Sequence, residues 1–179
     1  MVTAPTEVKK AADGEFSRPR LVCFVCTGNT CRSPMAEAVA NALSLEALNA
    51  YPAAVRDALA PPIQAVSAGL YAENGAPISR HALEALESAE IPTVKERDYH
   101  NHTAHTVTEE DADRADLLVA MTPAHAMELM MRFPAAAKKI TLMPMAISDP
   151  FGGDLAVYQA CLREITEGVR RLLFEEGAT

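Results

Sequence analysis

Short apolar runs alternate along the chain with longer segments in which apolar residues recur every three or four positions. The runs at residues 21–25, 63–67, 117–121 and 140–143 have the length and composition of strands buried on both faces. Helical spacing marks the segments between them and the last segment, residues 155–174. The alternation predicts an α/β fold: a single-domain three-layer sandwich with a four-stranded parallel sheet and helices on both faces.

Polar residues at the borders of these segments predict where helices begin. Ser33 is expected to be the N-cap of a helix, with Pro34 at its first position. Ser79 is expected to cap the next long helix. Thr108 and Asp111, three residues apart, resemble a capping box and predict a further helix start.

The length of 179 residues is sufficient for one domain with a substantial core. Residues 1–19 lack the apolar centre of a secretory signal and are predicted to form a flexible tail, with the domain spanning 20–179. The Ala-rich stretch 49–60, interrupted by Pro52, predicts a loop or a short second helix. A formal net charge of −8 disfavours nucleic acid as a partner, and no apolar run approaches the ~20 residues that cross a membrane.

The four cysteines are Cys23, Cys26, Cys31 and Cys161. Three of them lie within nine residues, which is no framework of stabilising disulfides for a domain of this size. This usage favours a reducing cytoplasm and thiol chemistry. Cys23 and Cys161, on a predicted strand and a predicted helix, are expected to belong to the core.

One stretch combines the features of an anion site. Cys26 ends the first strand, Arg32 begins the helical segment, and five residues lie between them. Backbone N–H groups of such a loop, together with the helix N-terminus, form a site for a phosphate-like anion. A thiol above those amides and beside a guanidinium favours its thiolate form, and the arginine can bind two oxygens of the anion. The pattern predicts a cysteine-based phosphatase.

Residues 25–37, Val-Cys-Thr-Gly-Asn-Thr-Cys-Arg-Ser-Pro-Met-Ala-Glu, closely resemble the signature of the low-molecular-weight protein tyrosine phosphatases. The resemblance extends from about Arg20 to Phe174, and it includes residues 67–69 (Ser-Ala-Gly) and 149–150 (Asp-Pro). It implies a phosphate-binding loop composed of Thr27, Gly28, Asn29, Thr30, Cys31, Arg32 and Ser33.

The resemblance also implies roles for individual residues. Cys26 resembles the nucleophile that forms a phosphocysteine intermediate, and Arg32 resembles the group that binds the phosphoryl oxygens. Asp149 resembles the general acid for the leaving group and then the base for the attacking water. Ser33 is expected to donate a hydrogen bond to the Cys26 sulfur.

A supporting set of residues is implied around Asn29, which is expected to hold a left-handed turn. Ser67 and His102 resemble the residues that hydrogen-bond Asn29. His100, His102 and His105 lie close together in the sequence, but no fourth ligand accompanies them, so we expect no metal and no cofactor.

Two positions resemble the bacterial protein-arginine phosphatases of this family. Thr30 stands where tyrosine phosphatases usually carry an aliphatic residue, and Phe151 is followed by Gly152 and Gly153 instead of a second aromatic residue. A threonine hydroxyl can hydrogen-bond near a P–N bond, and Asp149 can bind a guanidinium. Thr30 and Phe151 are therefore the predicted specificity residues.

The first hypothesis is a protein-arginine phosphatase that acts on phosphorylated proteins as a monomer. The alternative is a protein-tyrosine phosphatase of the same family. Arsenate reduction needs further cysteines to pass a disulfide along, and residues 32–160 contain none. A non-catalytic phosphate-binding module is disfavoured because the residues that match the nucleophile, the phosphoryl-binding arginine and the general acid are all present.

Cys26 and Cys31 also predict redox regulation. They lie five residues apart in a curled loop, so a reversible disulfide between them would switch off activity and protect Cys26 from over-oxidation. The alternative is that Cys31 is only a small loop residue.

Overall fold

The computed structural model describes residues 18–56 and 59–175, so most of the predicted tail lies outside the described residues. The strands are β1 (Arg20–Cys26), β2 (Ile63–Gly69), β3 (Leu117–Ala120) and β4 (Ile140–Leu142). The α-helices are α1 (Arg32–Asn49), α2 (Ala53–Arg56), α3 (Arg80–Ser88), α4 (Glu109–Arg114), α5 (Pro123–Arg132) and α6 (Leu155–Leu173), and two 3-10 helices are η1 (Tyr99–Asn101) and η2 (Pro134–Lys139).

The four strands form one sheet in the order β2-β1-β3-β4, and every neighbouring pair is parallel. In the centre, Phe24 of β1 is in register with Ser67 of β2 and with Val119 of β3. The prediction of a four-stranded parallel sheet is confirmed, and each strand falls within one or two residues of its predicted position. The carboxyl ends of β1 and β2 therefore meet at one edge of the sheet, which is where ligands bind in open parallel sheets.

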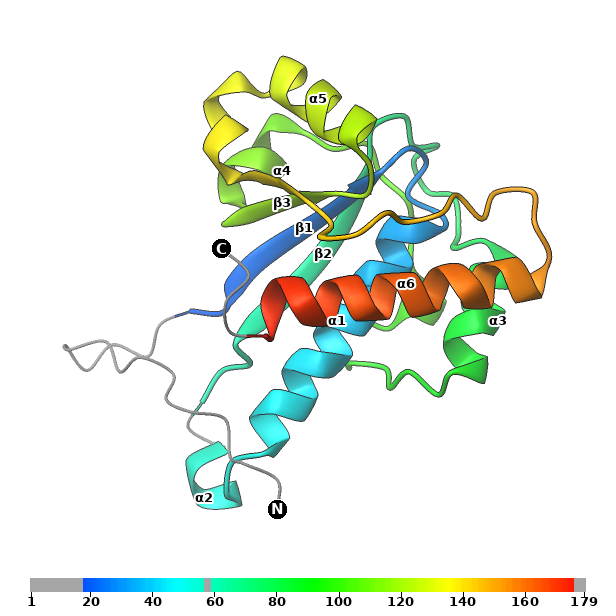
Figure 1. Ribbon diagram of the computed structural model, residues 1–179. Helices are drawn as coiled ribbons and strands as arrows, with labels where there is room; N and C mark the ends of the chain where they lie inside the picture. The colour runs from blue at the N-terminus through cyan, green and yellow to red at the C-terminus, as the bar shows by residue number, and fades with distance from the viewer. Residues whose placement is uncertain (1–17, 57–58, 176–179) are drawn as a thin grey trace.

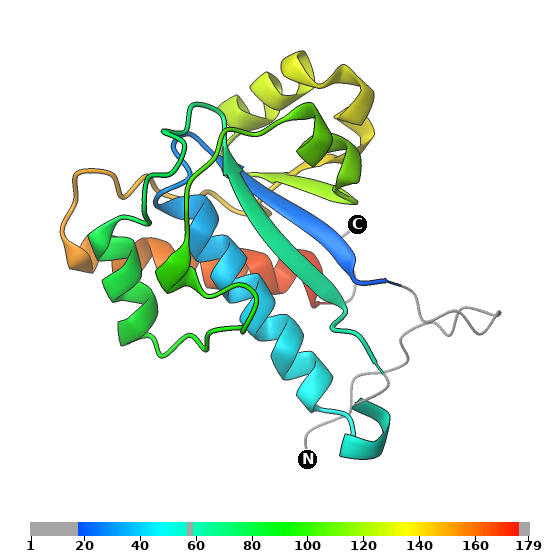
Figure 2. The same ribbon diagram turned by 180° about the vertical axis from the view of Figure 1, so that it is seen from behind.

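Alternate side chains of β1 enter two separate hydrophobic layers. Val22 and Phe24 belong to the cluster that includes α1, α3 and α6. Cys23 and Val25 belong to the second cluster, which includes α4, α5 and η2. Figures 1 and 2 show the two groups of helices on opposite faces of the sheet. This period of two explains why the β1 sequence is continuously apolar.

The outer strand β2 is covered by polar side chains of α1. Asn41 accepts from the Ala65 amide at 2.9 Å and donates to the Ala65 carbonyl at 3.0 Å. Ser44 makes the same pair of contacts with Ile63, at 2.8 and 2.9 Å. These bonds satisfy backbone groups that an edge strand otherwise leaves open, and they fix α1 along β2.

The predicted start of the first helix was wrong by two residues. The helix begins at Arg32, Cys31 is its N-cap, and Ser33 lies inside the first turn, so Pro34 is its third residue. The Ser33 hydroxyl is used by the loop before the helix instead of the helix end. Ser79 does occupy the N-cap of α3, but its side chain makes no capping bond.

Two other helix predictions are confirmed. Thr108 and Asp111 form a complete capping box at the start of α4. The Ala-rich stretch contains the short helix α2, at Ala53–Arg56. Among the described residues, no helix combines the length and apolar character that crossing a bilayer requires.

Candidate functional site

Carbonyl groups of the loop between β1 and α1 accept hydrogen bonds from the surrounding structure. The carbonyls and their donors are Cys26 with Leu70 N (2.9 Å), Thr27 with Tyr71 N (2.9 Å), Asn29 with His102 Nε2 (2.8 Å) and Thr30 with Ser79 N (2.9 Å). In a planar trans peptide the following N–H points the opposite way from the carbonyl. The amides of this loop are therefore directed toward its inside, as an anion-binding loop requires.

Asn29 is the centre of a buried hydrogen-bond network. Its φ of 54° is left-handed, as predicted, and the residue is fully buried. The side-chain amide donates to Ser33 Oγ at 3.0 Å and to Ser67 Oγ at 2.9 Å. The side-chain carbonyl accepts from the His105 amide at 3.0 Å, while His102 binds the backbone carbonyl. The Asn29 side chain thus binds Ser33, Ser67 and the His105 amide, which belong to three different segments, so the network fixes the loop conformation.

The network continues to the largely buried carboxylate of Glu37, for which the sequence predicted no role. The Ser67 hydroxyl donates to Oε2 of Glu37 at 2.6 Å. Burial raises the pKa of Glu37, while Ser67 and Arg97 oppose that shift. Glu37 lies within the signature motif, one turn after Ser33, and that placement was the signal available in the sequence.

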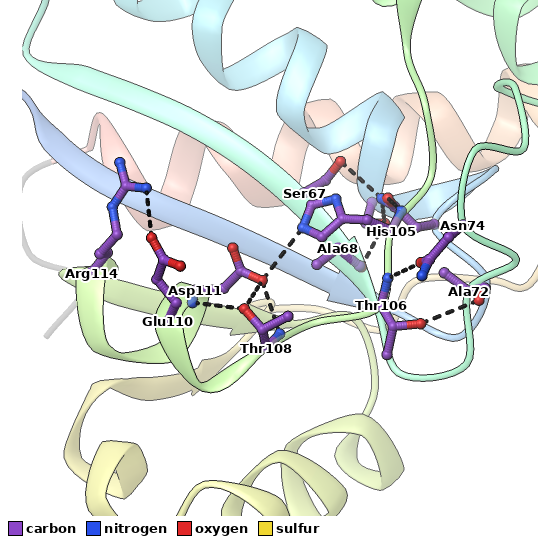
Figure 3. A network of polar contacts seen from close by, with 12 residues as sticks. Ser67, Ala68, Ala72, Asn74, His105, Thr106, Thr108, Glu110, Asp111 and Arg114 are labelled. Atoms are coloured by element: carbon purple, nitrogen blue, oxygen red, sulfur yellow. Dashed lines mark hydrogen bonds and ion pairs between the residues drawn. The ribbon is translucent and has the colours of Figure 1, made fainter.

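His105 joins the loop to the beginning of α4. Its backbone amide donates to the side chain of Asn29. Its Nε2 lies 3.4 Å from Oδ2 of Asp111, which belongs to the capping box of α4. Figure 3 shows His105 between Ser67 and Asp111, with Thr108 beside them. The segment that carries both His102 and His105 is thus held against the back of the loop.

The sulfur of Cys26 lies 3.0 Å from the Ser33 hydroxyl oxygen, and the cysteine is only 3% exposed. Ser33 has one hydroxyl proton and a second nearby acceptor, the Ala68 carbonyl at 3.2 Å. When Cys26 is a thiolate, it is the stronger acceptor of the two, because the sulfur then carries a full charge. The geometry therefore places a hydrogen-bond donor beside the Cys26 sulfur.

Arg32 and Asp149 form an ion pair at the mouth of the loop. Nη2 of Arg32 lies 2.9 Å from Oδ2 of Asp149, with side-chain exposures of 7% and 58% respectively. The other carboxylate oxygen accepts from the Phe151 amide at 3.2 Å. The loop before α6 thus presents the carboxylate to the anion site while leaving it accessible to solvent.

Gly69 allows β2 to approach the loop closely. A Cβ atom at this position would lie 2.7 Å from the Thr27 carbonyl oxygen and 3.0 Å from the Asn29 nitrogen. Because both contacts are with backbone, neither neighbour could move without displacing the loop. Gly69, the last residue of the Ser-Ala-Gly stretch, therefore lets β2 pack against the loop of the site.

The two predicted specificity residues lie on the outer parts of the site. Thr30 is partly exposed, with Oγ1 3.7 Å from the Cys31 sulfur. Phe151 is 82% exposed, and Gly152 follows it with a φ of 79°. The left-handed backbone at Gly152 explains a glycine at this position, since most side chains are strained there.

The remaining thiols differ in their surroundings. Cys31 donates to Ser79 Oγ at 3.4 Å and lies 3.3 Å from the Tyr158 hydroxyl. Burial, reinforced by Cys31, raises the pKa of Tyr158 to about 12. Cys23 and Cys161 are in the core, as predicted, and burial raises the pKa of each thiol. All four cysteines are free thiols.

The three neighbouring histidines have separate partners. His102 binds the loop, His105 pairs with Asp111, and His100 lies 2.6 Å from Asp98. Within residues 18–56 and 59–175, no group of histidine, cysteine or carboxylate side chains is arranged to hold a metal ion.

The family model for low molecular weight phosphotyrosine protein phosphatases matches residues 21–178. The chain belongs to this family. A protein-arginine-phosphatase of Bacillus subtilis (strain 168) is 33% identical over 159 residues, which cover 84% of this chain and 93% of that protein. A low molecular weight protein-tyrosine-phosphatase of Staphylococcus epidermidis is 30% identical, with 86% of this chain and 97% of that protein covered.

Among solved structures, a low molecular weight protein tyrosine phosphatase from T. tengcongensis aligns with a TM-score of 0.71 at 35% identity, covering 86% of this chain and 97% of that one. Family members named for phosphoarginine and for phosphotyrosine thus resemble this chain to a similar degree. The overall identity does not separate the two substrates, so a difference in substrate preference depends on individual site residues.

Proposed function

We propose that this family member is a cysteine-dependent protein phosphatase that hydrolyses phosphoarginine through a phosphocysteine intermediate. The observation that carries the proposal is the loop itself: a thiol next to a serine hydroxyl opens it, its amides are directed inward, and at its end a buried guanidinium pairs with an accessible carboxylate. Each part matches a need of phosphoryl transfer, which depends on positioning and charge stabilisation.

In the proposed first step, the Cys26 sulfur attacks phosphorus and the bond from phosphorus to the leaving group breaks. Arg32 and the loop amides bind the equatorial oxygens, and the Asp149 carboxylic acid protonates the leaving nitrogen. In the second step, the Asp149 carboxylate takes a proton from water as the water attacks the phosphocysteine. Inorganic phosphate leaves, and the Cys26 thiolate, accepting from Ser33, is regenerated.

Substrate preference is assigned to Thr30 and to the segment after Asp149. A phosphoarginine side chain carries a polar guanidinium next to the phosphoryl group, and both the Thr30 hydroxyl and the Asp149 carboxylate can bind such a group. One exposed aromatic residue, Phe151, followed by two glycines, offers less ring surface to a phosphotyrosine than a pair of aromatics.

The test is kcat/KM on two peptides of one sequence that carry phosphoarginine or phosphotyrosine. We expect the wild type to prefer phosphoarginine, Thr30→Ile to reduce that preference, and Thr30→Ser, which keeps the hydroxyl, to retain it. A preference of the wild type for phosphotyrosine would overturn the assignment of substrate and favour the tyrosine phosphatase alternative. Absence of hydrolysis of both peptides would overturn the proposed activity.

A further inference from the structure

The imidazole of His125 is buried against the phosphate-binding loop. It lies in the first turn of α5, where Thr122 accepts a hydrogen bond from the His125 amide at 3.3 Å. Figure 1 shows this end of α5 beside the end of β1, where the loop begins. His125 is only 7% exposed, whereas Met127 and Met131 of the same helix are 65% and 75% exposed. His125 thus lies on the buried side of α5, where packing alone does not require a polar ring.

The ring makes one side-chain hydrogen bond, and that bond is to the loop. Nε2 lies 2.9 Å from the Thr27 hydroxyl oxygen. Nδ1 is buried and has no hydrogen-bond partner among the described residues. Because a buried nitrogen without a partner is unfavourable, the polarity of this side chain is explained by its contact with Thr27.

Thr27 occupies a sensitive position in the loop. It directly follows Cys26, it precedes Gly28, and its backbone carbonyl is already bound by the Tyr71 amide at 2.9 Å. Glycine restricts the backbone less than any other residue, so the orientation of the first loop amides depends on how Thr27 is held. His125 binds the side chain of Thr27, and the Tyr71 amide binds its backbone carbonyl.

The charge around His125 favours a neutral ring. Burial is the main cause that lowers the pKa of His125, and the guanidinium of Arg32 lowers it further, against smaller opposing effects of Asp149 and Glu128. A neutral imidazole can exchange one hydrogen bond with a hydroxyl without placing a second full positive charge next to Arg32.

We propose that His125 is a positioning residue for phosphoryl transfer, which acts through Thr27 to orient the loop amides that follow Cys26. This inference rests on the proposed phosphatase function. Because those amides bind oxygens whose charge grows in the transition state, the loss of His125 is expected to lower kcat more than it changes KM.

The test compares four variants by kcat and KM on the preferred phosphopeptide, and by the affinity for orthovanadate, whose five-coordinate adduct resembles the transition state of phosphoryl transfer. His125→Leu removes both nitrogens, and Thr27→Val removes the hydroxyl of an exposed residue without threatening the fold. His125→Gln can place a polar atom near the Nε2 position, whereas His125→Asn can place one only near Nδ1. We expect kcat to fall roughly 10-fold to 100-fold in His125→Leu, Thr27→Val and His125→Asn, with recovery in His125→Gln.

The double variant Thr27→Val with His125→Leu separates the pair from two independent effects. Non-additive losses, close to those of either single variant, support the proposal. Wild-type kcat in Thr27→Val, or equal losses in His125→Gln and His125→Asn, would overturn it. If the wild type binds orthovanadate but hydrolyses neither phosphopeptide, the proposed function fails. Unchanged vanadate affinity in Thr27→Val then separately refutes the positioning role.

Discussion

The guanidinium of Arg32 and the carboxylate of Asp149 are in direct contact at 2.9 Å, although 117 positions separate them in the chain. In the proposed reaction, the same guanidinium binds the phosphoryl oxygens. The contact therefore holds the proposed acid next to the position of the leaving group, while its solvent exposure lets it exchange protons.

Replacing Asp149 by Asn is expected to lower kcat by ~10²–10⁴-fold, because the amide cannot protonate the leaving nitrogen. Asn keeps the size of the side chain and one acceptor oxygen, so the temperature of thermal unfolding should change little. The measurement is kcat on the preferred phosphopeptide and on p-nitrophenyl phosphate, whose leaving group needs less protonation. An equal loss on both substrates would contradict a role as general acid.

Replacing Cys26 by Ser is expected to abolish turnover, since a serine hydroxyl is a far weaker nucleophile than a thiolate in this position. Activity is measured with enzyme in large excess over any contaminating phosphatase. The control is Cys23→Ala, which removes a core thiol of the same strand on the other face of the sheet and should keep kcat while losing some stability. Appreciable activity of Cys26→Ser would refute the proposed nucleophile.

Replacing Asn29 by Ala is expected to destabilise the fold and slow the reaction. The change places an alanine in left-handed backbone, which costs about 1–2 kcal/mol. It also removes the donor to Ser67 and leaves the His105 amide without its side-chain acceptor. Asn29→Gly relieves the backbone cost but still loses the hydrogen bonds. Urea unfolding of the three proteins should rank wild type above Gly above Ala, and equal stability of Gly and Ala would exclude the backbone contribution.

Hydrogen peroxide is expected to inactivate the wild type in a way that a thiol reductant reverses. Peroxide converts the Cys26 thiolate to a sulfenic acid, and the Cys31 thiol displaces water from it to form the disulfide. Cys31→Ser cannot form this bond, so its inactivation should become irreversible at longer exposure. Mass spectrometry of both proteins identifies the oxidised species, and a wild type without the Cys26–Cys31 disulfide would contradict the prediction.

Acid is expected to weaken the fold through His102. Burial lowers its pKa against the opposing bond to the Asn29 carbonyl, so below the ordinary histidine value of about 6.5 the unfolded chain binds more protons than the folded one. Stability from this residue is thus present above that pH and lost as the pH falls. His102→Gln, which can still donate to Asn29, should lose less stability than the wild type between pH 7 and pH 5.

His100 provides a control of opposite sign for that measurement. The hydrogen bond with Asp98 raises the pKa of this exposed histidine, so its contribution is present at low pH and lost as the pH rises. His100→Gln should therefore lose slightly more stability than the wild type on acidification. The same response in both variants would contradict the assignment to His102.

Local pattern was sufficient to predict the elements and the loop. The apolar runs located all four strands because a strand buried on both faces must be apolar along its whole length. The spacing of Cys26 and Arg32 indicated an anion site because a strand, a tight loop and a helix start are contiguous in the chain. The prediction of Ser33 as a helix cap was wrong because tertiary contacts with Cys26 and Asn29 compete for its hydroxyl.

The sequence alone thus determined the class of fold, the place of the anion site and the residue types available for chemistry. The resemblance had already indicated Asp149. Only the tertiary structure decided which distant groups meet: Asp149 at Arg32, the His105 amide at Asn29 and the His125 ring at Thr27, pairs that are 117, 76 and 98 positions apart. The physical reason is that strand order and helix packing set these contacts, and the chain carries no local periodicity that records which of its polar side chains will meet.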